Sequence, residues 1–147
     1  MELNLTPNLK LKLLLKMEQL NSQLNFLSKL NCSQLNCDNS KAASINLEKL
    51  LSSHEIDIFL AQDVYCSQRG INSQLVPPEI RGYNSLFKCK SNEAPKVVIY
   101  AKSKISMTIL PQASDRYCIT CSLDTGNNVL FCHLYIAPHL IMHLQTD

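Results

Sequence analysis

Residues 30–63, LNCSQLNCDNSKAASINLEKLLSSHEIDIFLAQD, contain the alternation of elements that decides the fold. LNCSQLNC, residues 30–37, reads as a short strand, and IDIFLA, residues 56–61, is a compact apolar run typical of a buried strand. Between them, Ser40 is a good N-cap for a helix over residues 41–53, which carries its apolar side chains on one face. Strand, helix and strand in this order predict a βαβ-like unit with two parallel strands.

Downstream of this unit the sequence is rich in strands. Residues 63–82 read as loop, because Gly and Pro punctuate them. Five further runs have the composition of strands: residues 83–89, 96–101, 106–110, 117–123 and 129–136. Residues 124–128, DTGNN, are a good hairpin connection between the last two. The predicted fold class is α+β, a partial two-sheet sandwich with flanking helices.

Residues 1–29 are predicted to form an amphipathic, Leu-rich helix that precedes the domain at residues 30–147. Its apolar side chains recur at steps of four or three residues, at Leu9, Leu13, Met17, Leu20, Leu24 and Leu27. This spacing is typical of a helix that packs on its own domain, and it also fits a short coiled-coil seam. Self-association, or binding of a partner helix, through the stripe between Leu9 and Leu27 therefore stays open.

The composition describes one domain-sized chain without a strong electrostatic field. Its 147 residues include 14 basic and 12 acidic side chains, a net charge of +2, and 46% are hydrophobic. Such a chain is too apolar for intrinsic disorder. Its small net charge indicates neither a nucleic-acid ligand nor an acidic binding partner. The N-terminal segment lacks the basic lead of a signal peptide, and lysines interrupt any membrane-spanning run. These features predict an intracellular protein of the nucleus or cytoplasm, not secreted, with no membrane partner.

The seven cysteines fit a reduced protein better than a disulfide scaffold, because their number is odd and they are scattered through apolar runs. Cys118 and Cys121 form a Cys-x-x-Cys motif inside a predicted strand, where residues three apart face opposite sides. A zinc site also needs a second pair of Cys or His at fixed spacing, and none is evident. Zinc is therefore disfavoured.

Three predicted strands end in polar side chains. Asn36 closes the first strand, Asp63 follows the strand at residues 56–61, and Tyr135 closes the last. An amide, a carboxylate and a phenol that project from strand ends into one crevice could converge on a metal-bound phosphate. Each could equally cap a strand or a turn, as short polar side chains often do.

Taken in order, the segments QLN, SKAA, LEKLLSSHEIDIFLAQD, GY, VVIYAK and VLFCHLYIAP resemble the amino-terminal half of the endonuclease/exonuclease/phosphatase superfamily. The chain is most similar to the apurinic/apyrimidinic-type endonuclease domain of LINE-type, non-LTR retrotransposons. The resemblance covers residues 30–138. It implies two packed sheets flanked by helices, and a nuclease whose reaction is Mg²⁺-dependent hydrolysis of a DNA phosphodiester.

The resemblance also implies roles for three side chains. Asn36 corresponds to the amide that helps to hold the metal and phosphate end of the site, and Tyr135 to the phenol that contacts the scissile phosphate, so both are catalytic candidates. Asp63 takes the position of the metal-binding glutamate. Mg²⁺ prefers carboxylate and water oxygens, and it polarises phosphoryl oxygens and shields the charge of the transition state.

Two departures from the family pattern argue against activity. Asp63 is one methylene shorter than the glutamate it replaces, in a metal geometry that tolerates little misplacement. The chain ends at Asp147, before the family's Asp-x-Asn and Ser-Asp-His motifs. His133, His139 and His143 do not stand in either motif, so they cannot substitute for these residues. The expectation is a truncated or decayed endonuclease domain that is not catalytically competent alone. The alternative is a non-catalytic binding or assembly protein.

Any contact with DNA is expected to be weak. Lys88 and Lys90 are candidates for a basic rim, although surface lysines are usually only solvated. A net charge of +2 supports at most a salt-sensitive, sequence-independent contact.

Overall fold

The chain divides into two compact units, Met1–Leu30 and Asn31–Asp147. The computed structural model describes residues 11–12, 14–18, 21–22, 29–71, 74–124 and 129–134, and it describes side chains as far as residue 124. None of the helices in these ranges is long and apolar enough to cross a membrane.

In the first unit, the described residues between positions 11 and 22 are helical. Four large apolar side chains of this helix are exposed: Leu11, Leu14, Leu15 and Met17. Five members of the predicted stripe lie outside the described residues: Leu9, Leu13, Leu20, Leu24 and Leu27. What the stripe packs against therefore stays a prediction.

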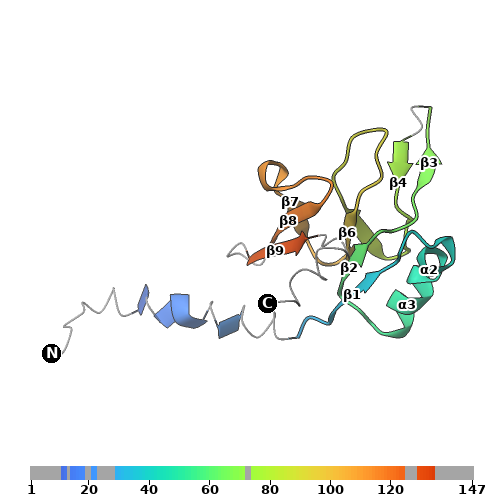
Figure 1. The fold of residues 1–147 in the computed structure, drawn as a ribbon. Coiled ribbons are helices and arrows are strands. Elements are labelled where there is room, and N and C mark those ends of the chain that lie inside the picture. The colour runs from blue at the N-terminus through green and yellow to red at the C-terminus, as the bar shows by residue number, and fades with distance from the viewer. Residues whose placement is uncertain are drawn as a thin grey trace, which may run out of the picture. The chain divides into compact units, whose positions relative to one another are not determined.

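A four-stranded sheet in the order β1-β2-β6-β5 forms the centre of the second unit (Figure 1). Its strands are β1 (Cys32–Asn36), β2 (Ile58–Gln62), β6 (Val97–Lys102) and β5 (Tyr83–Leu86). β1 runs parallel to β2, whereas β6 is antiparallel to both β2 and β5. The parallel pair confirms the βαβ-like unit predicted from residues 30–63.

Two short helices, α2 (Lys41–Ile45) and α3 (Leu47–Ser53), connect β1 to β2. The predicted N-cap is confirmed, because the Ser40 hydroxyl accepts a hydrogen bond from the Ala43 N–H at 3.2 Å. The prediction of one continuous helix is wrong at Asn46, which ends α2 and begins α3. Asn is a poor helix-interior residue, since its side chain competes for backbone hydrogen bonds.

One face of the central sheet packs against these helices and forms the main core. Buried side chains of this core come from α3, β2 and β6, and include Leu47, Leu51, Phe59, Ala61, Val98 and Tyr100. Because side chains alternate along a strand, the remaining buried residues of β6, Val97, Ile99 and Ala101, point to the opposite face. The central sheet is therefore covered on both sides.

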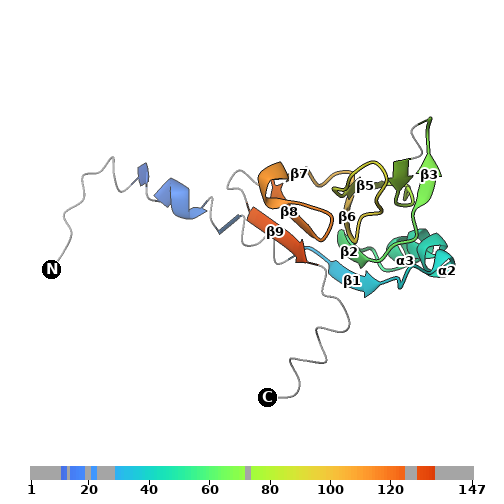
Figure 2. The same cartoon turned by 45° about the horizontal axis from the view of Figure 1, so that its top comes forward.

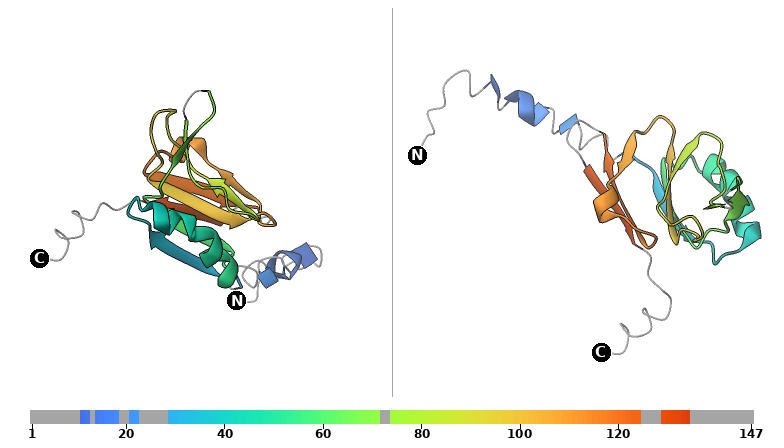
Figure 3. Two further views of the ribbon diagram at one scale, coloured as in Figure 1. Left: turned by 90° about the vertical axis from the view of Figure 1, so that its right-hand side faces the viewer. Right: turned by 90° about the horizontal axis from the view of Figure 1, so that it is seen from above.

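A three-stranded antiparallel sheet, in the order β7-β8-β9, covers that opposite face (Figures 2 and 3). Its strands are β7 (Met107–Ile109), β8 (Cys118–Leu123) and β9 (Val129–Leu134). Ile119, Cys121 and Leu123 of β8 are buried, whereas Cys118 is only partly buried on the other side of the strand. The two cysteines thus face opposite sides, as predicted, and the α+β fold with two packed sheets is confirmed.

Residues 63–82 are less irregular than predicted. They contain a small hairpin of β3 (Ser67–Arg69) and β4 (Gln74–Val76), with Gly70 at φ 77° at its turn. Strands of three residues, with β3 exposed throughout, carry too little apolar periodicity to stand out beside the Gly and Pro signals. A single 3₁₀ turn, η1 (Pro111–Ala113), joins β7 to β8.

Candidate functional site

The carboxyl ends of the parallel strands β1 and β2 lie side by side. Asn36 is in register with Gln62, so both amide side chains point to the same face of the sheet. The Cys37 N–H donates to the Gln62 carbonyl at 2.8 Å and extends the pairing by one residue. A cavity of about 280 Å³ opens on this face, lined by Gln34, Leu35, Asn36, Leu60 and Gln62.

The backbone around this strand end is locally unusual. Asp38, Asn39 and Asp63 adopt left-handed φ angles of 51°, 53° and 46°. The Asp38 N–H donates to Asn36 Oδ1 at 2.8 Å, and the Asn39 N–H donates to the Asp63 carbonyl at 2.7 Å. Asp and Asn tolerate this conformation better than other side chains, because they hydrogen-bond locally. The first bond closes the turn after β1, and the second ties this turn to the residue after β2.

Asp63 is buried and carries an ion pair. Its carboxylate Oδ1 lies 2.7 Å from Lys96 Nζ, and its side chain is only 8% exposed. The Asp63 N–H also donates to the Lys96 carbonyl at 3.0 Å, and the Lys96 N–H donates to the Arg116 carbonyl at 2.9 Å. Burial, and then the nearby Asp63 charge, raise the pKa of the Cys37 thiol. Asp63 is thus buried and is held by Lys96 through both its side chain and its backbone.

The structure brings two of the three predicted site residues to adjacent strand ends. Asn36 lines the cavity, whereas Asp63, one position beyond the Asn36–Gln62 pair, faces Lys96 and is not part of its lining. Tyr135 lies outside the described residues, and no side chain beyond residue 124 is described, which includes His133. The roles of Asn36, Asp63 and Tyr135 stay predictions.

Two residues of this region were missed in the sequence. Asp38 places an exposed carboxylate two positions after Asn36, and the polar run after the strand was a usable signal for it. Lys96 gave no such signal, because a lysine before an apolar run looks like an ordinary solvated charge. Its partner becomes visible only with the β2–β6 register.

A divalent ion fits the described residues poorly. Its oxygen ligands here would be Asn36, Asp38 and Asp63, but the Asn36 oxygen already accepts from a backbone N–H, and Asp63 is paired with an ammonium. Within the described ranges, no three or more His, Cys, Asp or Glu side chains are grouped as metal ligands. A metal at Asp63 would have to displace or repel Lys96.

A second cavity, of about 410 Å³, gathers the predicted basic residues. Its lining carries three cations and two carboxylates, and consists of Lys88, Cys89, Lys90, Glu93, Ser114, Asp115, Arg116 and Tyr117. The Arg116 guanidinium lies 5.4 Å from the centre of the Tyr117 ring, and Arg116 Nε is buried without a hydrogen-bond partner in the described part of the chain. The charge balance favours an anion in this cavity.

The fold is similar to that of a known nuclease domain. No protein family model matches the chain, and no curated protein sequence matches it. Among solved structures, the endonuclease domain of TRAS1, a telomere-specific non-LTR retrotransposon, matches 76% of this chain with a TM-score of 0.54 and 16% sequence identity. The match covers 48% of that domain, so this chain spans about half its length. The predicted resemblance to retrotransposon endonuclease domains is confirmed for the fold.

Proposed function

We propose that this chain is a decayed part of an endonuclease domain of the non-LTR retrotransposon type, whose ancestral reaction was Mg²⁺-dependent hydrolysis of a DNA phosphodiester. It lacks catalytic competence because Asp63, one methylene shorter than the glutamate it replaces, is paired with the Lys96 ammonium. The observation that carries the proposal is the position of Asn36 and Asp63 at adjacent carboxyl ends of β1 and β2, in a fold similar to such a domain. In α/β arrangements, side chains at strand ends commonly build the site.

In this proposal, three side chains are remnants of the phosphate-binding end. Asn36 presents its amide to the cavity of about 280 Å³, and the Tyr135 hydroxyl would donate a hydrogen bond to a phosphate oxygen. Asp63 is the former metal ligand, and Mg²⁺ would have supplied polarisation of the phosphoryl oxygens. The Lys96 ammonium is paired with Asp63 and would repel Mg²⁺ from this carboxylate, which supports the proposed loss of activity.

DNA is the proposed partner, bound weakly. Lys88, Lys90 and Arg116 line one cavity, where a phosphate would be attracted by three cations against two carboxylates. With a net charge of only +2, affinity is expected to fall steeply with salt and to be independent of sequence.

Nicking of supercoiled plasmid in Mg²⁺ tests the proposal. The chain and its Asn36→Ala variant are expected to give no more open circles than a mock purification from the same host. Loss of a single acid–base function already removes a factor of about 10² to 10⁴ in rate. Nicking by the chain above the mock level, lost in Asn36→Ala, would show a competent enzyme and overturn the proposal.

Assembly through the N-terminal helix is the second candidate function. Four large apolar side chains of this helix are each more than half exposed: Leu11, Leu14, Leu15 and Met17. Light scattering should then give a mass larger than that of one chain for the wild-type protein, and the mass of a single chain for Met17→Lys. Equal monomer masses for both proteins would exclude self-association through this helix.

A further inference from the structure

The β2–β6 ladder ends in a Lys–Asp ion pair at each end. Beyond the pair Gln62↔Val97, Asp63 faces Lys96, and beyond Ile58↔Ala101, Asp57 faces Lys102. Both pairs also share a backbone hydrogen bond of 3.0 Å, from the Asp63 N–H to the Lys96 carbonyl and from the Lys102 N–H to the Asp57 carbonyl. The two ends are thus matched in geometry.

The two ends differ in their surroundings. Asp63 lies at the carboxyl ends of β1 and β2, next to the Asn36–Gln62 pair, and its side chain is 8% exposed. Asp57 lies at the opposite end of β2, away from the cavity beside Asn36, and is 15% exposed. Of the two lysines, Lys96 and not Lys102 therefore pairs with the carboxylate that we assign as the former metal ligand.

Lys96 is held in place by its backbone. Its N–H donates to the Arg116 carbonyl at 2.9 Å, its carbonyl accepts from Asp63, and it directly precedes the fully buried Val97. The lysine side chain is 25% exposed, with Nζ 2.7 Å from Asp63 Oδ1. An ammonium at this distance neutralises the carboxylate and occupies one of its oxygens.

We propose that Lys96 is the built-in cation of this site and replaces the divalent ion that the fold implies. Its ammonium occupies Oδ1 of Asp63 and blocks divalent cations from the carboxylate. This inference rests on the proposed function for the assignment of Asp63 as the former metal ligand.

Titration with Mn²⁺, followed by the paramagnetic resonance signal of the free ion, tests the inference without any activity. The wild-type chain should leave the signal unchanged. Lys96→Met removes the charge and keeps the stem, and should bind Mn²⁺ at least about 10-fold more tightly, because the repulsion between two neighbouring cations is gone. The double variant Lys96→Met with Asp63→Asn should lose this binding.

Lys102→Met is the matched control, since it frees Asp57 at the other end of the same ladder. It should bind Mn²⁺ no better than wild type. Lys96→Met is expected to melt at a lower temperature than wild type, and Mn²⁺ should raise its melting temperature while leaving that of wild type unchanged. If Lys96→Met does not fold, Lys96→Gln, which keeps a neutral donor for Asp63, takes its place.

Two results would overturn the inference: wild-type binding of Mn²⁺ that is lost in Asp63→Asn, or equal Mn²⁺ affinities for Lys96→Met and Lys102→Met. Neither result bears on plasmid nicking by the wild-type chain, which decides the proposed function separately.

Discussion

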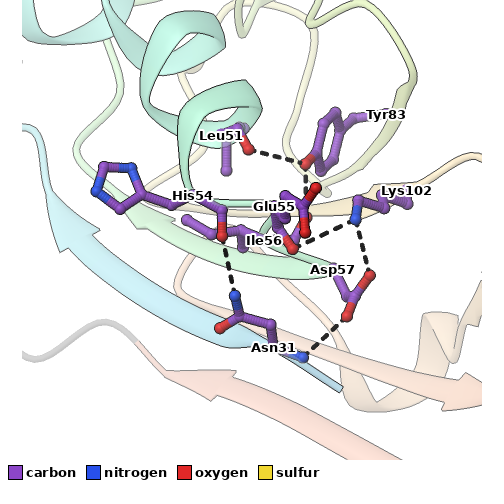
Figure 4. A network of polar contacts seen from close by, with 8 residues as sticks. All are labelled: Asn31, Leu51, His54, Glu55, Ile56, Asp57, Tyr83 and Lys102. Carbon is purple, nitrogen blue, oxygen red and sulfur yellow. Dashed lines mark hydrogen bonds and ion pairs between the residues drawn. The ribbon is translucent and has the colours of Figure 1, made fainter. Parts of the chain in front are cut away.

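Asp57 and Lys102 are joined twice, each time at 3.0 Å. The Lys102 N–H donates to the Asp57 carbonyl, and Lys102 Nζ donates to Asp57 Oδ1, the contact drawn in Figure 4. The second carboxylate oxygen, Oδ2, accepts from the Asn31 N–H at 2.9 Å. Asp57 therefore ties together the residue before β1, the start of β2 and the end of β6. Both oxygens of its carboxylate accept hydrogen bonds from within the fold.

This network predicts how stability depends on pH. Burial raises the pKa of Asp57, but the Asn31 N–H and Lys102 outweigh it, so that the net pKa is lowered. A lowered pKa in the folded state means stability that is present above the unfolded pKa of about 3.9 and lost as pH falls through the folded value. Asp57→Asn should cost about 1–3 kcal/mol at pH 7, and less in acid.

Thermal melts between pH 7 and pH 2 check this. The melting-temperature difference between wild type and Asp57→Asn should stay constant down to about pH 4 and then shrink. The pKa of Lys102 is raised, chiefly by its hydrogen bond to Asp57, so its contribution is lost only as pH rises past about 10.4. A difference that grows below pH 4 would contradict the lowered pKa of Asp57.

Tyr83→Phe should destabilise the unit by about 1–2 kcal/mol, because it leaves a backbone carbonyl without its donor. The Tyr83 hydroxyl donates to the Ile56 carbonyl at 2.5 Å, and the Leu51 carbonyl lies 3.4 Å away (Figure 4). Urea unfolding measures the loss. Tyr65→Phe is the control, since that side chain is 42% exposed and the change should stay within about 0.5 kcal/mol. Equal losses for both variants would contradict the role of the hydroxyl.

Much of the fold could be predicted from local sequence. The run at residues 56–61 marked β2, and the polar break before residue 40 marked the N-cap, because both signals depend only on neighbours in the chain. The exposed hairpin of β3 and β4 and the break at Asn46 could not be predicted from the sequence, since three-residue strands and a helix interruption have no periodicity of their own.

The site could be predicted only in part. Asn36 ends β1 and Asp63 follows β2, so their meeting required only the parallel pairing that the sequence suggested. Lys96 is 33 positions from Asp63, and its pairing depends on the antiparallel register of β6 with β2, which no local pattern encodes. Electrostatic partners across a sheet are therefore the part that sequence reasoning misses first.

The cavity beside Lys88 and Lys90 predicts a measurable salt effect. With a fluorescent DNA duplex, the plot of log affinity against log salt should become shallower by about 0.9 for each phosphate that is no longer neutralised. The double variant Lys88→Ala with Lys90→Ala should thus reduce the slope by about 1 to 2. Lys49→Ala, on the exposed side of α3, is the control for loss of a surface lysine elsewhere and should leave the slope unchanged. An unchanged slope in the double variant would argue against DNA in this cavity.

Cys66 should react slowly with alkylating agents. Burial, with a smaller effect of Cys89, raises the pKa of the Cys66 thiol to about 11, and its sulfur donates to the Val64 carbonyl at 3.4 Å. Only the thiolate reacts, so raising pH from about 7.4 to 9.4 should speed alkylation about 100-fold, against about 10-fold for an ordinary thiol. Peptide mapping by mass spectrometry resolves the site, with the urea-unfolded chain as reference. An ordinary pH response in the folded chain would contradict the raised pKa.

Ser44 is the buried hydroxyl that fixes the segment following Asp63. It is 2% exposed on α2, and its Oγ accepts from the Tyr65 N–H at 2.9 Å. Ser44→Ala leaves that N–H without an acceptor, which should cost about 1–3 kcal/mol in urea unfolding. The exposed Ser52 of α3, whose hydroxyl bonds only within its own helix, gives the control Ser52→Ala, with an expected change below about 0.5 kcal/mol. Because Tyr65 is two residues from Asp63, amide exchange of residues 63–66 should also accelerate in Ser44→Ala more than in β6. Equal acceleration in both segments would mean that the hydroxyl stabilises the unit globally instead of holding this turn.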